Sequence, residues 1–403
     1  MRVPAPASLR GLPRETYVLA LVAFCVALGF GIVAPAVPLF AREFGVGTTA
    51  AGAVVSAFAL MRLVSGLGAG RLADKVGERA ALLTGLAIVA VSSLLAGLSA
   101  NFPQLLVLRG IGGIGSALFT IAATSLLLRL ASSAQRGRTQ SVYRSGFLLG
   151  GIVGPGFGGA VLGISLRAPF FLYAFTLLLA IVAAATLLPT AATLERRAED
   201  EPVAAQPASR TTLTQALRSP AYQAALAGNF ATGFSLLGVR GLVIPLLIVD
   251  GLGLAPGWVG VAFVVAAAVQ ALLLLPAGRA VDDIGRRPTL VTGSVLSALA
   301  LIGLGLATGP VSLLLATVVF AAGAALLGVA PAAIVGDVVE GRGGTAIAVW
   351  QMASDLGSVI GPVAAGFLID RASFEVALLA SAAVVGVCAL LGLRVPKVVP
   401  TAV

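Results

Sequence analysis

The stretch GRLADKVGER, from Gly70 to Arg79, recurs 208 positions later as GRAVDDIGRR, from Gly278 to Arg287. Five of the ten aligned residues are identical, and each copy follows a long apolar run. A charged loop that is duplicated between apolar segments predicts a membrane protein built from two related halves.

Shorter echoes at nearly the same offset support the duplication. Pro-Leu at 38–39 returns at 245–246, and Gly-Pro at 154–155 returns at 361–362, each 207 positions later. We therefore predict an N-terminal bundle at 1–188, a C-terminal bundle at 222–403 and a charged, solvated linker at 189–221 between them.

The composition places this chain in a lipid bilayer. Hydrophobic residues make up 59% of the chain and charged residues only 10%, against about 25% charged in a soluble domain. A bilayer core of about 30 Å needs roughly 20 apolar residues per helix. Twelve such runs are present, which predicts an all-α protein of two pseudo-symmetric six-helix bundles. The runs are 16–40, 48–69, 80–99, 102–128, 141–164, 168–188, 222–248, 257–277, 288–308, 311–335, 345–369 and 373–393.

The basic residues set the expected orientation. The net charge is +10, but the Lys and Arg residues are scattered through short loops, which argues against a nucleic-acid partner. With the N-terminus inside, 20 of the 26 basic residues fall in cytoplasmic segments and 3 in outer loops. The positive-inside rule then predicts a multi-pass protein of the inner (plasma) membrane with both termini in the cytoplasm.

Residues that carry enzyme chemistry are scarce. The chain has no histidine, and both cysteines, Cys25 and Cys388, lie within apolar runs. We expect no metal site, no cofactor and no enzymatic activity, and a proton carrier would have to be a carboxylate.

The duplicated loop resembles the signature of the major facilitator superfamily, G-x-L-x-D-x-x-G-x-R. The first copy carries it as Gly70, Leu72, Asp74, Gly77 and Arg79, with Glu78 where the family usually has a basic residue. This resemblance implies twelve spans and a loop that gates the cytoplasmic side. The corresponding residues of the second copy are Gly278, Asp282, Gly285, Arg286 and Arg287.

Span 4 carries an arginine, Arg109, inside its apolar run, and the surrounding residues are similar to a superfamily pattern. A guanidinium in hydrocarbon normally faces a cavity or a partner, which makes it a functional candidate. Its counterpart in the second half is Ala316, so Arg109 is not a packing device common to both halves. The alternative is an arginine that snorkels or is structurally paired.

Span 5 carries a glycine-proline motif, G-x-x-x-G-P-x-x-G-G. It consists of Gly150, Gly154, Pro155, Gly158 and Gly159. Small residues at every fourth position let helices approach closely. The motif also resembles the signature of the drug/proton antiporters of the superfamily, and this resemblance implies export rather than uptake.

Asp355 lies near the middle of span 11 and is the candidate proton carrier, with Arg109 as a coupling partner. Alternatively, Asp355 forms a permanent ion pair with Arg62 or Arg109. In the superfamily fold, eight spans face the central path, and their polar residues are the candidate substrate cavity. These are Arg62, Tyr143, Asn229, Arg240, Gln270, Trp350 and Gln351.

The resulting hypothesis is a monomeric, proton-coupled antiporter that exports a small organic compound by alternating access, with protons and the lipid bilayer as its other partners. Two alternatives remain open. One is a proton-coupled uptake symporter or facilitator for a sugar or organic anion, and the other is a lipid-translocating or receptor-like membrane protein. No ATP-binding loop of the type G-x-x-x-x-G-K-[ST] is present in the sequence.

Overall fold

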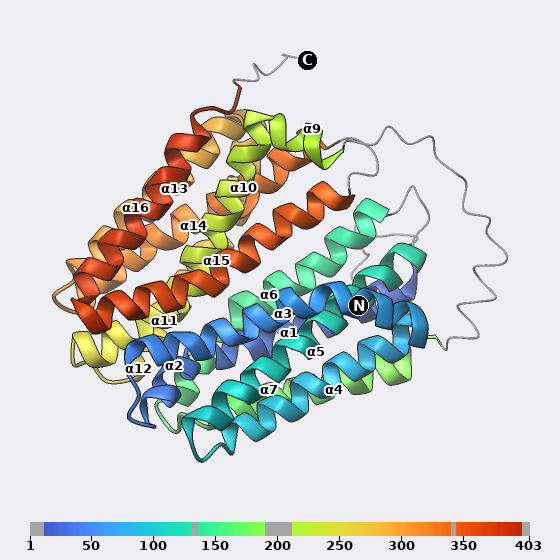
Figure 1. Cartoon of the computed structure of the whole chain (residues 1–403), viewed down its shortest axis with the longest axis horizontal. Helices are drawn as coiled ribbons and strands as arrows, with labels where there is room; N and C mark the ends of the chain where they lie inside the picture. The colour runs from blue at the N-terminus through green and yellow to red at the C-terminus, as the bar shows by residue number, and fades with distance from the viewer. Residues whose placement is uncertain (1–11, 131–135, 190–211, 340–343, 397–403) are drawn as a thin grey trace, which may run out of the picture. The chain divides into compact units, whose positions relative to one another are not determined.

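The computed structural model describes residues 12–130, 136–189, 212–339 and 344–396, and every regular element in these ranges is a helix (Figure 1). Twelve helical segments in these ranges are long and apolar enough to cross a membrane. The predicted all-α architecture of twelve spans is therefore confirmed.

The first six spans comprise seven helices, because α2 continues α1 within span 1. They are α1 (Arg14–Val33), α2 (Ala36–Arg42), α3 (Thr48–Val76), α4 (Glu78–Gly97), α5 (Phe102–Leu130), α6 (Arg136–Leu162) and α7 (Ala168–Leu187).

The second six spans follow a short helix, α9 (Leu213–Arg218). Span 7 is not a uniform α-helix, since two π-helical segments interrupt it. Its parts are α10 (Pro220–Thr232), η2 (Gly233–Val239), α11 (Arg240–Leu246) and η3 (Leu247–Gly251). The remaining spans are α12 (Gly257–Asp283), α13 (Arg286–Gly305), α14 (Pro310–Val338), α15 (Gly344–Arg371) and α16 (Phe374–Gly392).

The turns between spans follow from glycine and proline. Gly77 precedes α4 with φ of 84°, and Gly285 precedes α13 with φ of 108°. Side chains strongly disfavour this left-handed region, so the two glycines of the duplicated loop permit the same tight reversal in both halves. Pro220 and Pro310 begin α10 and α14, where a missing backbone N–H costs nothing.

The chain forms two compact units, which do not coincide with the two sequence repeats because the division cuts spans 1, 2 and 5. The first unit comprises residues 1–33, 61–155 and 167–205. Within it, α1 packs on α7, and α4 packs on both α5 and α7.

The second unit comprises residues 34–60, 156–166 and 206–403. Within it, α13 packs between α14 and α16, and α10 lies against α14 and α15 (Figure 1). One end of spans 1, 2 and 5 of the first repeat is therefore part of the same compact unit as the second repeat.

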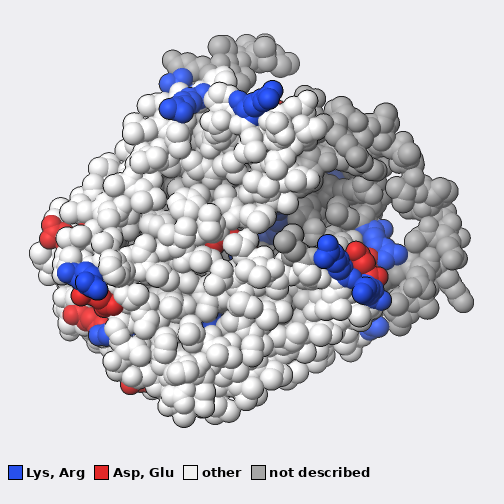
Figure 2. Space-filling view, in the orientation of Figure 1, with Lys and Arg blue, Asp and Glu red and all other residues white. Residues whose placement is uncertain are grey.

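The outward faces of the helices are apolar. Leu272, Leu275 and Val311 are each more than 70% exposed, and Figure 2 shows broad stretches of surface without a charged side chain. A water-soluble protein rarely exposes contiguous apolar surface of this extent. These faces are the lipid-contacting surface of a multi-pass membrane protein.

Candidate gates and transport site

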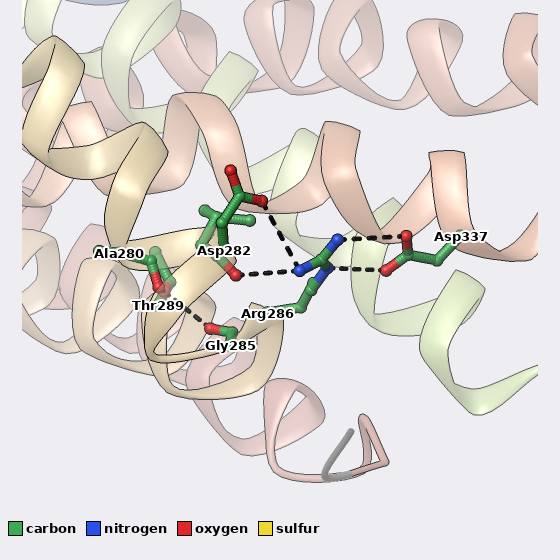
Figure 3. A network of polar contacts seen from close by, with 7 residues as sticks. Ala280, Asp282, Gly285, Arg286, Thr289 and Asp337 are labelled. Carbon is green, nitrogen blue, oxygen red and sulfur yellow. Dashed lines mark hydrogen bonds and ion pairs between the residues drawn. The ribbon is translucent and has the colours of Figure 1, made fainter. Parts of the chain in front are cut away.

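The second copy of the duplicated loop forms a charged network around Arg286 (Figure 3). Arg286 Nε donates to Asp337 Oδ2 at 2.8 Å, and its Nη1 lies 3.7 Å from Asp282 Oδ1. Thr289 Oγ1 donates to the carbonyl oxygen of Gly285 at 2.8 Å, which ties the turn to the first residues of α13. Sequence analysis identified Asp282, Gly285 and Arg286 but not their partner Asp337.

The first copy forms the same bridge with the two charges exchanged. Arg129 Nη1 donates to Glu78 Oε1 at 2.6 Å. Glu78 and Arg129 each lie 208 positions before Arg286 and Asp337 respectively, so the two ion pairs occupy equivalent places in the repeats. The departure of Glu78 from the family pattern is thus matched by the arginine at the end of α5.

The other loop residues differ in their surroundings. Arg79 Nη2 donates to the carbonyl oxygen of Ala185 at 2.5 Å, which joins α4 to the end of α7. Asp74 is exposed near the end of α3, and Arg287 is half-buried at the start of α13. Gly70 and Gly278 have open space where a side chain would stand, so the turn glycines Gly77 and Gly285 are the structurally restricted ones.

Within the first unit, the glycines of α6 bring this helix into backbone contact with α1. A Cβ atom at Gly150 would lie 2.7 Å from Leu28 N, and one at Gly154 would lie 2.9 Å from the Gly31 Cα atom. Conversely, a Cβ at Gly31 would lie 2.7 Å from Pro155 Cδ. These distances are too short for a side chain, so the motif glycines are required for this packing.

Within the second unit, α15 repeats this arrangement against span 7. A Cβ atom at Gly357 would lie 2.6 Å from Phe234 N, and one at Gly361 would lie 2.7 Å from Phe234 O. Gly357 and Gly361 follow Gly150 and Gly154 by 207 positions, so the internal echo in the sequence corresponds to an equivalent helix contact.

Segments of the two repeats also meet inside the second unit, and we call this set of contacts the inter-repeat seam. Its polar part joins α2 and α3 to η3 and α15. Arg42 Nε lies 3.4 Å from Asp250 Oδ2. Thr48 N and Thr49 N donate to the two oxygens of Asp370 at 2.8 and 2.7 Å, and Thr49 Oγ1 donates to Asp370 Oδ2 at 2.6 Å.

Further along the seam, Ser56 Oγ donates to the carbonyl oxygen of Val359 at 2.6 Å. The rest of the seam consists of backbone contacts at glycine. A Cβ atom at Gly159 would overlap the backbone of Gly260 in α12, and one at Gly366 would lie 2.6 Å from Thr48 O. Gly158, the neighbouring motif residue, is also buried. The seam lies at the end of the second unit opposite the Gly285 turn, since α12 and α15 each connect the two ends.

In the first unit, the intramembrane arginines gather around a tyrosine that sequence analysis missed. Arg109 is 6% exposed, and its guanidinium interacts electrostatically with Tyr173. Tyr173 is 2% exposed and also interacts with Arg62. Tyr143 is buried and packs edge-on against Phe147 at a centroid distance of 5.4 Å. The predicted coupling residue Arg109 and the predicted cavity residue Arg62 therefore share one aromatic neighbour on α7.

In the second unit, Asn229 Nδ2 donates to the carbonyl oxygen of Trp350 at 2.6 Å, so these two predicted residues meet. Arg240 lies over the ring of Phe263, with its Cζ atom 4.9 Å from the ring centroid. Phe263 was not predicted. The other predicted residues do not share one type of environment, because Gln270 and Asp355 are half-buried and Gln351 is exposed.

Comparison with known proteins agrees with this architecture. Residues 19–240 and 230–402 match the sequence pattern of the Major Facilitator Superfamily. The chain belongs to this superfamily of transporters. Its duplicated loop and paired bundles are thus family features, and the resemblance stated from the sequence is confirmed.

Similar proteins include two whose names refer to drug resistance. The chain is 26% identical over 357 residues to Multidrug resistance protein 2 of Bacillus subtilis (strain 168). This alignment covers 86% of this chain and 86% of that protein. It is 32% identical over 162 residues to the Quinolone resistance protein NorA of Staphylococcus aureus (strain Mu50 / ATCC 700699), covering 39% of this chain and 41% of that protein.

The fold is similar to that of a POT family transporter, whose crystal structure was determined in complex with a thioalcohol conjugated peptide. The TM-score is 0.75 at 14% sequence identity, and 96% of each chain is covered. At this identity the similarity concerns the fold alone.

Proposed function

We propose that this chain is a proton-driven antiporter that exports small organic compounds by alternating access, acting as a monomer. The observation that carries the proposal is the glycine-proline helix α6. Its glycines place the backbones of α6 and α1 in contact, where a Cβ atom at Gly150 would lie only 2.7 Å from Leu28 N. Helices packed this closely leave no water-filled gap through which protons could bypass the carrier.

The orientation follows from the basic residues. We place both termini and the turns at Gly77 and Gly285 in the cytoplasm of a bacterial inner membrane, because 20 of the 26 basic residues then lie inside. The inter-repeat seam then lies at the outer end. It acts as the outer gate in its closed state, and alternating access requires its contacts to break when the transporter opens outward.

Coupling is assigned to Asp355, with Arg109 as the second charged residue of the pathway. A carboxylate in the middle of a span can gain and lose a proton as its access changes from one side to the other. One elementary charge moved across 100 mV supplies about 2.3 kcal/mol. That is enough for roughly fifty-fold accumulation of a substrate at about 1.4 kcal/mol per decade.

The substrate is assigned as a small, largely apolar organic compound. The names of the two drug-resistance relatives support this assignment, and so do the mixed polar and apolar surroundings of the candidate cavity residues. The second unit brings polar and aromatic side chains together, as with Arg240 and Phe263, a combination that suits compounds with an apolar body and a few polar groups.

The test uses the purified full chain in liposomes with an imposed pH gradient. A panel of cationic, neutral and anionic aromatic compounds is supplied on either side, while a pH-sensitive dye inside the vesicles reports proton movement. The proposal predicts that substrate moves against the proton gradient and that each substrate causes a countercurrent proton flux. Movement of substrate in the same direction as protons would establish uptake and refute antiport, and transport without proton movement would refute coupling.

A further inference from the structure

Arg240 is a cation placed deep inside span 7, at the junction where the π-helical η2 ends and α11 begins. It stands eleven residues before the end of the span at Gly251, or about 16 Å of helix at roughly 1.5 Å per residue. The position 208 residues earlier is Ile32, a buried aliphatic residue. Arg240 is therefore specific to the second repeat and has no packing equivalent in the first.

Two of the three nitrogens of the Arg240 guanidinium donate to no acceptor in the described part of the chain. Nε and Nη1 are fully buried and make no hydrogen bond to any residue that the structure describes. The residue as a whole is half-buried. The edge of the guanidinium that carries Nε and Nη1 is thus withdrawn from solvent.

The surroundings of Arg240 provide an aromatic face but no counter-charge. The Cζ atom of Arg240 lies over the Phe263 ring at 4.9 Å from its centroid, a cation–π contact. No ion pair joins Arg240 to an acid in the described part of the chain. Asp250 pairs with Arg42 instead, and Asp370 accepts from the start of α3.

A buried guanidinium without a partner is costly in an apolar interior, and the cost is recovered when an anion binds. Its planar fork matches a carboxylate through two parallel N–H···O hydrogen bonds. Phe263 is 4% exposed and lies against the guanidinium, so a carboxylate bound there when the site opens would have an apolar neighbour for the body that it is attached to.

We propose that Arg240 and Phe263 form a binding site for the carboxylate of an anionic organic substrate. The proposal rests on the proposed export function and names the class of compound exported. Arg240 supplies the charge that selects the anion, and Phe263 contacts the apolar group next to the carboxylate.

The experiment compares matched aromatic compounds that differ only in charge, namely nalidixic acid, benzoic acid and naphthoic acid with their methyl esters. Transport by the purified full chain in liposomes is measured as KM and kcat, and binding is measured as the shift in Tm. The wild type should prefer each acid over its ester by about thirtyfold or more in kcat/KM, the discrimination expected for a desolvated charge pair.

Arg240→Gln should abolish this preference by raising KM for the acids while leaving the esters unchanged. Arg240→Lys, which keeps the charge but not the fork, should retain part of it. Phe263→Leu should weaken acids and esters to a similar degree. Arg218→Gln removes an exposed cation in α9 and is the matched control, with the acid preference expected to persist.

The outcomes separate the two proposals. If the wild type exports the esters or cations as efficiently as the acids, or if Arg240→Gln keeps the acid preference, the carboxylate site is wrong although export stands. If the wild type moves no compound of either charge, the export function itself fails. Should Arg240→Gln not fold, Arg240→Lys decides the question: a reduced acid preference and a smaller acid-dependent Tm shift support the site, and wild-type values of both refute it.

Discussion

Asp370→Asn should loosen the outer gate. In the seam, the carboxylate of Asp370 accepts the backbone N–H groups of Thr48 and Thr49 at 2.8 and 2.7 Å, and the Thr49 hydroxyl at 2.6 Å. These donors stand at the start of α3, where the helix dipole also favours a negative charge. An asparagine would keep one acceptor oxygen and would point an NH2 group at donors already present.

The size of the effect follows from these contacts. Asp370 is exposed at the end of α15, so each lost contact is worth less than a buried charge-assisted hydrogen bond. Two contacts at about 0.5 kcal/mol each, together with about 0.5 kcal/mol for the dipole, give about 1.5 kcal/mol. If the contacts exist only in the closed gate, the open population should rise about tenfold.

The assay measures access to the seam from outside. Ser56 is 4% exposed and donates to Val359 across the seam. In a background where Cys25 and Cys388 are replaced by alanine, Ser56→Cys provides a single thiol. Its alkylation by a membrane-impermeant maleimide should be about tenfold faster in Asp370→Asn, if the open gate limits the reaction.

Glu375→Gln is the control. It removes an exposed carboxylate from the first turn of α16, at the same end of the second unit as Asp370. Equal alkylation rates in Asp370→Asn and its parent would refute the assignment of Asp370 to the gate. The same rise in Glu375→Gln would attribute the effect to general electrostatics instead.

Three further predictions concern other parts of the transporter. Asp355→Asn should abolish substrate-driven proton flux while leaving downhill substrate movement, and accumulation against a gradient in this variant would contradict its role as carrier. Glu78→Arg should lower the Tm by a few degrees because the new arginine would face Arg129. Adding Arg129→Asp should restore the Tm, since the second repeat already has an arginine and an aspartate in these positions. A double variant with a Tm no higher than that of the single variant would argue against pairing. Gly159→Val should reduce export at least tenfold because a side chain there overlaps the backbone of α12, whereas Gly151→Ala, with open space around its Cβ, should not; normal export by Gly159→Val would show that this contact is dispensable.

Hydropathy predicted the number of spans correctly because the membrane imposes a helix length of about 20 residues wherever an apolar run occurs. It predicted the helix ends less well. The run 48–69 was expected to be span 2, but α3 continues to Val76, since hydropathy does not register a helix that extends into charged residues beyond the bilayer. The π-helical segments of span 7 gave no signal, because their sequence is as apolar as the rest of the span.

Contacts between distant residues were the least predictable feature. Asp370 is 322 positions from Thr48 and 321 positions from Thr49. In the sequence nothing distinguishes it from an ordinary charged residue at the end of a span, beside Arg371. The Glu78–Arg129 bridge was accessible in principle, because each residue has an oppositely charged counterpart exactly one repeat length later. Identity between the repeats does not reveal this bridge, because its two charges are exchanged.

The Arg42–Asp250 pair bears on how a two-repeat carrier is assembled. The two residues are 208 positions apart, the offset of the duplicated loop, so they hold nearly the same place in their repeats and meet each other across the internal symmetry. Two identical halves brought together in this way would oppose arginine to arginine, or aspartate to aspartate, and repel. The attraction therefore exists only in a molecule whose halves have diverged, and two copies of either half could not rebuild this closure by associating as separate chains.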